Sequence, residues 1–163
     1  MGRFAREGTV RREEEQRLIS ARQRDEMEHR RVEDMAALAR KIGDVDLMPT
    51  LTVDQIKRKL ASEPEVESED GAYPGRSVFA KGLVVLHWRH LSLNTTELLS
   101  LEINRPFSGS IGGVHIGDSL QTAFRASRAS GYPNAKIVGE EINLDSHWSM
   151  RVRENQIRVS MNQ

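Results

Sequence analysis

Apolar and polar residues alternate along the last stretch of the chain, from residue 148 to residue 161. The apolar positions are Trp148, Met150, Val152, Ile157, Val159 and Met161. A turn at Glu154-Asn155 places all of them on one face of an antiparallel hairpin, as a half-buried pair of strands requires. The same register sets Arg151 directly opposite Arg158 on the other face. The pattern therefore predicts a hairpin with an apolar inner face and a cationic outer face.

The N-terminal part of the chain lacks this alternation and predicts a long helix. Between Arg11 and Ile42 there is no proline or glycine, and residues that favour helices dominate. A seam of positions at helical spacing consists of Leu18, Ala21, Asp25, Glu28, Val32, Met35, Ala39 and Ile42. Only its second half is apolar, so we expect an exposed helix whose C-terminal turns dock on a folded domain. The alternative is a coiled coil that joins chains through this seam.

The next segment predicts a short helix followed by strands. Thr52 and Gln55 have the spacing of a capping box, just before an apolar stripe that includes Ile56 and Leu60. Residues 63–70 predict an acidic loop that ends in Gly71 and the turn residues Tyr73-Pro74-Gly75. Strands are expected at Ser77–Ala80, Leu83–Leu93 and Leu98–Ile103. The last two strands are joined either by a turn at Asn94-Thr95 or by a longer loop.

The final segment repeats this order of elements. A glycine-rich loop at 108–113 precedes a helix whose N-cap we expect to be Asp118, with Gln121 at capping-box spacing, and which we expect to end at Gly131. A strand at Ala135–Leu144 and the C-terminal hairpin follow. His87-Trp88 in the first segment is echoed by His147-Trp148 in the second.

We therefore predict an α+β fold in which a long N-terminal helix is followed by two helix-plus-antiparallel-sheet units. The expected boundaries are 1–46 for the charged helical extension, 47–106 for the first unit and 107–163 for the second. The two units form a tandem repeat of architecture, with insertions, rather than of sequence identity.

One stretch of the second unit carries a resemblance. The run Gly113–Ser119, a helix with Ala123, and then Gly131-Tyr132-Pro133 resemble the small outer-membrane assembly lipoprotein and β-lactamase-inhibitor-protein group of bacteria. The resemblance covers 113–163 well and 50–105 poorly. It implies a helical layer on a curved antiparallel sheet, two such units in tandem, and a sheet surface that binds protein without catalytic machinery. The chain departs from the group because it has no signal-peptide pattern and no lipid-bearing cysteine.

Composition narrows the function classes. The 163 residues carry no net charge, 37% are hydrophobic, 29% are charged, and none is cysteine. Neutrality argues neither for nucleic acid nor for an anionic membrane as partner. No apolar run approaches the roughly 18 residues of a membrane span. The lack of disulfides fits a reducing compartment, so a cytoplasmic location is expected.

The outer face of the predicted hairpin is the candidate site. Like charges directly opposite each other destabilise a sheet, so the Arg151–Arg158 pair asks for an explanation. One explanation is that a local glutamate (Glu140, Glu141 or Glu154) neutralises it or that the long side chains splay into water. The other is that it forms a cationic patch for an acidic protein surface. The candidate partner-binding residues are His147, Arg151, Arg153 and Arg158, with His87 and Arg89 contributed by the first unit.

Other chemistry finds little support in the sequence. His87 and His90 point to opposite faces of one strand, and Asp145 with His147 lacks a third ligand, so neither a metal nor another cofactor is expected. Ser119 is better explained as part of a helix cap than as a nucleophile. Acidic residues interleave with the N-terminal arginines, which favours a solvated helix over nucleic-acid binding. The acidic loop either is a solvated connector or inserts into a basic cleft on a target.

These observations predict a non-enzymatic protein-binding module: an inhibitor, an immunity-like protein or an assembly factor. Its partner is another protein. The alternative is a structural or scaffold subunit that forms homo-oligomers through the N-terminal helix.

Overall fold

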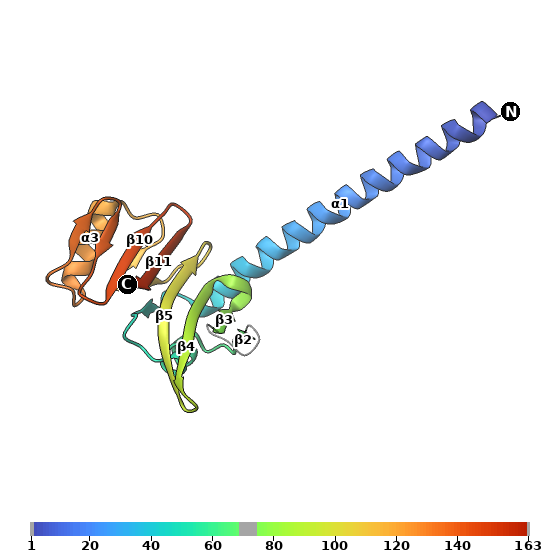
Figure 1. The fold of residues 1–163 in the computed structure, drawn as a ribbon. Helices are drawn as coiled ribbons and strands as arrows, with labels where there is room; N and C mark the ends of the chain where they lie inside the picture. The colour runs from blue at the N-terminus through green and yellow to red at the C-terminus, as the bar shows by residue number, and fades with distance from the viewer. Residues whose placement is uncertain (1, 69–74, 163) are drawn as a thin grey trace. The chain divides into compact units, whose positions relative to one another are not determined.

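The computed structural model describes residues 2–68 and 75–162, and it is a mixed α+β structure with a long N-terminal helix and antiparallel strands (Figure 1). The chain divides into two compact units, Met1–Asp34 and Met35–Gln163. The fold class predicted from the sequence is confirmed at this level. The predicted turn residues 71–74 lie outside the described residues, and so does the end of the acidic loop.

The long helix α1 spans Gly2–Ile42. Side chains at positions 10–34 are exposed, including the apolar Val10, Leu18 and Met27. The last turns are different: Ala39 is buried, and Met35, Leu38 and Ile42 pack against the core of the second unit. The prediction that the C-terminal turns dock on the domain is therefore confirmed.

The short helix α2 spans Val53–Leu60 and begins with the predicted capping box. The Gln55 backbone N–H donates to the Thr52 hydroxyl at 3.1 Å, and the Thr52 N–H donates to the Gln55 side-chain oxygen at 2.9 Å. These bonds satisfy N–H groups that have no partner within the helix. Ile56 and Leu60, one turn apart on the same face of the helix, are buried in the core.

The second unit contains one eight-stranded antiparallel sheet with the order β2-β3-β4-β5-β11-β10-β9-β8. Its strands are β2 Glu65–Ser68, β3 Gly75–Phe79, β4 Val84–Ser92, β5 Thr95–Asn104, β8 Lys136–Val138, β9 Glu141–Asn143, β10 Trp148–Val152 and β11 Gln156–Met161. A single 3-10 turn, Ala80–Gly82, joins β3 to β4. The last strand of the chain thus lies in the middle of the sheet.

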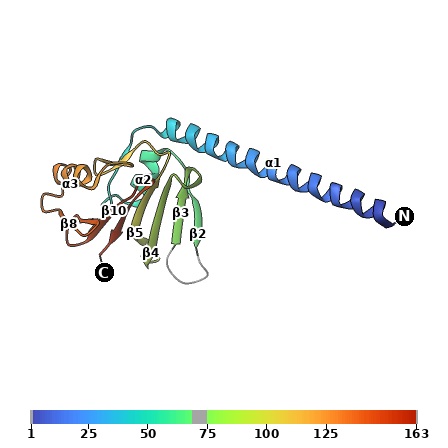
Figure 2. The same cartoon turned by 90° about the horizontal axis from the view of Figure 1, so that it is seen from above.

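The core lies between one face of this sheet and the helices α2 and α3, which share the same side in Figure 2. Leu86, Leu101 and Met150 are among the sheet residues that face it, all at 0–1% exposure. Gly75 pairs with Trp88, and the packing requires a glycine there because a Cβ atom would come within 2.2 Å of the indole ring. The indole N–H donates to the Ser77 hydroxyl at 2.8 Å, so this buried donor is satisfied.

The C-terminal hairpin forms with the predicted register. Trp148 pairs with Met161, Met150 with Val159 and Arg151 with Arg158. The backbone N–H of Arg153 donates to the Gln156 carbonyl at 2.8 Å across the predicted turn. Trp148, Met150, Ile157 and Val159 are buried, as expected of the inner face.

Helix α3, Leu120–Ala129, begins one residue later than predicted. Its N-cap is Ser119, whose hydroxyl accepts from the Thr122 N–H at 3.2 Å. The Asp118 carboxylate instead accepts from the His115 N–H at 2.9 Å and so stabilises the preceding turn. Gly131 follows the helix with φ of 113°, a conformation that favours glycine at a helix end.

Three predictions, of a strand, a loop and a turn, are corrected. The expected strand at Ala135–Leu144 is a hairpin of β8 and β9, because Gly139 adopts φ of 63° and Val138 pairs with Glu141. Part of the predicted acidic loop forms the edge strand β2. The β4–β5 turn lies at Leu93-Asn94, with Ser92 opposite Thr95, because register shifts in this hairpin displace the pairing.

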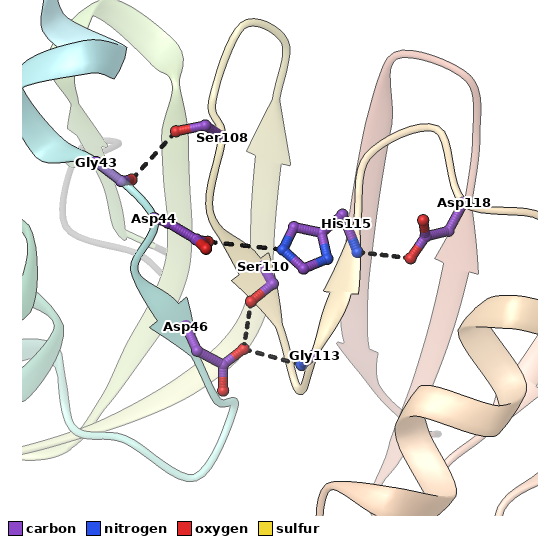
Figure 3. A network of polar contacts seen from close by, with 8 residues as sticks. All are labelled: Gly43, Asp44, Asp46, Ser108, Ser110, Gly113, His115 and Asp118. Carbon is purple, nitrogen blue, oxygen red and sulfur yellow. Dashed lines mark hydrogen bonds and ion pairs between the residues drawn. The ribbon is translucent and has the colours of Figure 1, made fainter.

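A small second sheet has the order β1-β6-β7. Its strands are β1 Asp46–Leu47, β6 Ser110–Ile111 and β7 Val114–His115, and β1 runs parallel to β6. Asp46 joins them: its Oδ1 accepts from the Ser110 hydroxyl at 2.7 Å and from the Gly113 N–H at 2.9 Å (Figure 3). Residues 108–113 were expected to form a loop, so these strands were not predicted.

Among the described residues, no helix has a stretch that is both apolar and long enough to cross a bilayer.

Candidate functional site

The candidate site lies on the outer face, the face of the large sheet opposite α2 and α3. The pairing of four adjacent strands places four charged residues side by side across it. Glu141 of β9 pairs with Arg151 of β10, Arg151 with Arg158 of β11, and Arg158 with Glu102 of β5. Two guanidinium groups thus occupy the middle of a row that has a carboxylate at each end.

Arg151 is neutralised by Glu141. Its Nη2 lies 2.6 Å from Glu141 Oε1, and its Nε donates to the same oxygen at 3.1 Å. Both side chains are about half exposed, at 52% and 40%. Of the three glutamates considered from the sequence, Glu141 is the one that forms this pair.

Arg158 is not neutralised in the same way. It is exposed, and among the described residues no carboxylate lies within ion-pair distance of it and no group accepts a hydrogen bond from its guanidinium. The carboxylate of Glu102 accepts instead from the Asn104 side-chain amide at 3.1 Å. Arg158 therefore lies opposite a like charge and has no ion-pair partner among the described residues.

Short side chains next to this row leave a hollow. Ser160 and Ser149 are paired across β11 and β10, one position along from the arginines on the same face. Because serine side chains are much shorter than the adjacent arginine side chains, the surface is depressed at this point. The resulting hollow has a volume of about 160 Å³ and is lined by Glu141, Ser149, Arg151, Arg158 and Ser160.

His87 of β4 lies in line with the serines of β5, β11 and β10 across the sheet. It pairs with Ser100 of β5, which in turn pairs with Ser160. The Nδ1 of His87 lies 2.9 Å from the Ser100 hydroxyl oxygen. Partial burial lowers the pKa of His87 below 6.5, and the positive charges of Arg158 and Arg76 lower it further, while Glu102 opposes them. The pKa of His87 therefore depends on the positive charge of Arg158.

The other predicted site residues lie away from the hollow. Arg89 is farther along β4, where its Nη2 lies 2.6 Å from Glu97 Oε2. Arg153 is in the β10–β11 turn, and His147 precedes the opposite end of β10. Both are exposed. The structure thus brings Arg151 and Arg158 together, places His87 nearby, and leaves His147, Arg153 and Arg89 at the periphery.

Four residues at the site were missed in the sequence: Ser100, Glu102, Ser149 and Ser160. The places of Ser100 and Glu102 depend on the pairing of β5 with β11, two strands far apart in sequence. Ser149 and Ser160 carried a signal, since they occupy outward positions of the predicted hairpin, in line with Arg151 and Arg158.

The chemistry that this face offers is hydrogen-bond donation to an anion. The histidine next to a serine has the composition of a nucleophile–base pair, but Ser100 is only 2% exposed, so its hydroxyl is out of reach of a substrate in solution. Within the described part of the chain, no group of three or more histidine or acidic residues is placed to hold a metal ion.

Comparison with protein-family models found no match, and neither did comparisons with curated proteins or with solved structures. The resemblance stated from residues 113–163 therefore stays a prediction.

Proposed function

We propose that the chain is a non-enzymatic binding module that docks a partner protein on the outer face of its large sheet. The observation that carries this proposal is the exposed guanidinium of Arg158, which faces Arg151 and forms no ion pair with a described residue. Two like charges opposite each other destabilise a sheet, and Glu141 forms an ion pair with only one of these two arginines. An acidic surface on a partner would supply the missing countercharge and would also speed association.

A finer description of the fold belongs to this proposal. Helix α2 precedes the strand order β2-β3-β4-β5, and α3 precedes β8-β9-β10-β11. The last strands of the two series, β5 and β11, pair antiparallel. We interpret the two series as tandem copies of one helix-plus-sheet unit that together provide a single broad face. This arrangement supports a role as an inhibitor, immunity-like protein or assembly factor, and the expected cytoplasmic location stays a prediction.

Reversal of one charge tests the docking face. The full-length chain is used as bait in a lysate of its native host, beside Arg158→Glu and Arg125→Glu. Arg125 is an exposed arginine on α3 and serves as the control with the same change of charge. We expect one protein that the wild-type chain and the control capture and Arg158→Glu does not.

The interaction is then measured with both proteins purified. Loss of a paired interfacial charge costs enough to raise Kd at least about tenfold for Arg158→Glu, and the affinity should fall with salt. Equal affinity of Arg158→Glu and wild type would refute the docking face. Failure of the wild-type chain to retain any protein at low salt would count against the proposal as well.

A second candidate function, a scaffold that oligomerises through α1, is favoured by a separate observation. Apolar side chains at Leu18, Ile19 and Val32 are 54–61% exposed on this helix. Isolated helices gain most of their stability from packing, so a second α1 is a natural partner.

Analytical ultracentrifugation of the full chain tests this alternative. The variant Leu18→Glu/Val32→Glu places two charges in the predicted seam, and Gln16→Glu/Gln23→Glu adds the same charge away from it. A scaffold requires an oligomer that the first variant dissociates and the second preserves. A monomer at all concentrations would refute the scaffold and leave the docking face unaffected.

A further inference from the structure

The hollow on the outer face contains two hydrogen-bond donors that the protein does not use. One is the guanidinium of Arg158, and the other is the hydroxyl of Ser160, for which no partner exists among the described residues. The remaining donors in the hollow are engaged. Ser149 donates its hydroxyl hydrogen to Asn162 Oδ1, and Arg151 binds Glu141. The free donors therefore lie on one strand, β11.

The charges around the hollow define the ligand. Two arginines and one glutamate line it, so its lining carries an excess of one positive charge. One carboxylate would neutralise it. A doubly charged phosphate would add a negative charge beside Glu141, which like-charge repulsion disfavours. The planar guanidinium also matches the two oxygens of a carboxylate.

We infer that this hollow binds the carboxylate of a single aspartate or glutamate side chain presented by the partner protein. The inference rests on the proposed docking function and adds to it a defined contact point. Arg158 is the ion-pair partner and Ser160 donates a hydrogen bond to the same carboxylate. A volume of about 160 Å³ accommodates the carboxylate and the carbon atoms that carry it.

Acetate is the probe for the hollow itself. It is titrated into the full-length protein at constant ionic strength, with chloride as the replaced anion, and side-chain NMR signals of Arg158 and His87 are followed. We expect a saturable shift of the Arg158 Nε–H signal. A carboxylate beside Arg158 should also raise the pKa of His87, because it offsets the positive charge that lowers it.

Two variants and a second anion complete this test. Arg158→Gln should abolish the saturable shift, whereas Arg125→Gln should preserve it. A linear response, or the same response in Arg158→Gln, would overturn the inference. Inorganic phosphate that binds more tightly than acetate would overturn the assignment to a carboxylate.

The purified partner tests the source of the carboxylate. Arg158→Lys and Ser160→Ala should each raise Kd about tenfold, the usual effect of losing a hydrogen bond to a charged group. The control Ser62→Ala, at a partly exposed serine near the end of α2, should leave Kd unchanged. An aspartate or glutamate of the partner, mutated to its amide, should then lose its effect in the Arg158→Gln background.

The outcomes separate this inference from the proposed function. If Arg158→Glu abolishes partner binding but acetate does not bind and Ser160→Ala has no effect, the docking face stands and the carboxylate contact is refuted. If acetate binds but Arg158→Glu leaves partner binding unchanged, the proposed docking function is refuted and the hollow is a site for free carboxylates.

Discussion

At the scale of single residues, His87 links the outer face to the stability of the fold. Its pKa is lower in the folded protein than the 6.5 of an unperturbed histidine, mainly because burial disfavours the imidazolium. The groups that face it are Arg158, Arg76, Glu102 and the Ser100 hydroxyl. Between the folded pKa and 6.5 the unfolded chain binds more protons than the folded chain.

This difference predicts a loss of stability in mild acid. The His87 contribution is fully present above pH 6.5 and is lost as the pH falls from there to the folded pKa. His87→Gln should flatten this part of the pH dependence of the unfolding free energy, measured by urea denaturation. An unaltered slope in His87→Gln would contradict the assignment.

Tyr132 provides a second prediction at this scale. Its ring is buried, and within the described residues its hydroxyl has no hydrogen-bond partner. Burial, together with the carboxylates of Asp145 and Asp46, raises its pKa to about 12. Removal of an unsatisfied buried hydroxyl should stabilise the fold, so Tyr132→Phe should raise the unfolding free energy by about 1 kcal/mol. Tyr132→Leu, which also removes ring contacts, should lower it, and a destabilised Tyr132→Phe would reveal a partner for the hydroxyl.

At the scale of elements, the three-stranded sheet depends on one carboxylate. Asp46 accepts hydrogen bonds from Ser110 of β6 and from Gly113 in the following turn. The nearby Asp44 instead has its Oδ1 3.6 Å from Nε2 of the exposed His115 (Figure 3). Asp46→Ala should lower the unfolding free energy by about 1–2 kcal/mol, because Ser110 is buried and loses its partner. Asp44→Ala, the matched control, should stay within about 0.5 kcal/mol of wild type. Chemical denaturation measures both, and equal effects would contradict the role given to Asp46.

The elements that could be predicted are those with a strong local pattern. Alternation over residues 148–161 specified the hairpin register because a slip of one residue would expose the whole apolar face. The strands β8 and β9 were merged although Ile137 and Ile142 are five residues apart, a spacing that places them on opposite faces of one continuous strand and on the same face of a hairpin. Strands of two residues, such as β1 and β6, are too short to carry any periodicity.

At the scale of the whole molecule, the two compact units should differ in local stability. Side chains at positions 10–34 of α1 are exposed, whereas β5 and β11 lie in the centre of the sheet and supply buried core residues. Hydrogen exchange followed by mass spectrometry should show amides of 10–34 exchanging at least about a hundredfold faster than those of β5 and β11. Comparable protection in both regions would contradict this expectation and would favour a second chain packed on α1.

The candidate site could be predicted only in part for a reason that also belongs to this scale. Arg151 and Arg158 face each other through a local hairpin, so the sequence revealed the pair. The hollow also needs Glu141, and the place of His87 near Arg158 needs the pairing of β4 with β5 and of β5 with β11, so both depend on pairings across the sheet. Pairing between strands far apart in the chain is decided by the total burial of the core, which no local pattern encodes.

The central position of β11 has a consequence for a chain that is still incomplete. Before residues 156–161 have left the ribosome, β11 cannot form. The strands β5 and β10, which flank β11 in the complete sheet, then lack a partner on that side. Such bare strand borders recruit other chains. A premature stop codon just upstream of Gln156 should therefore yield aggregates rather than a slightly shortened protein.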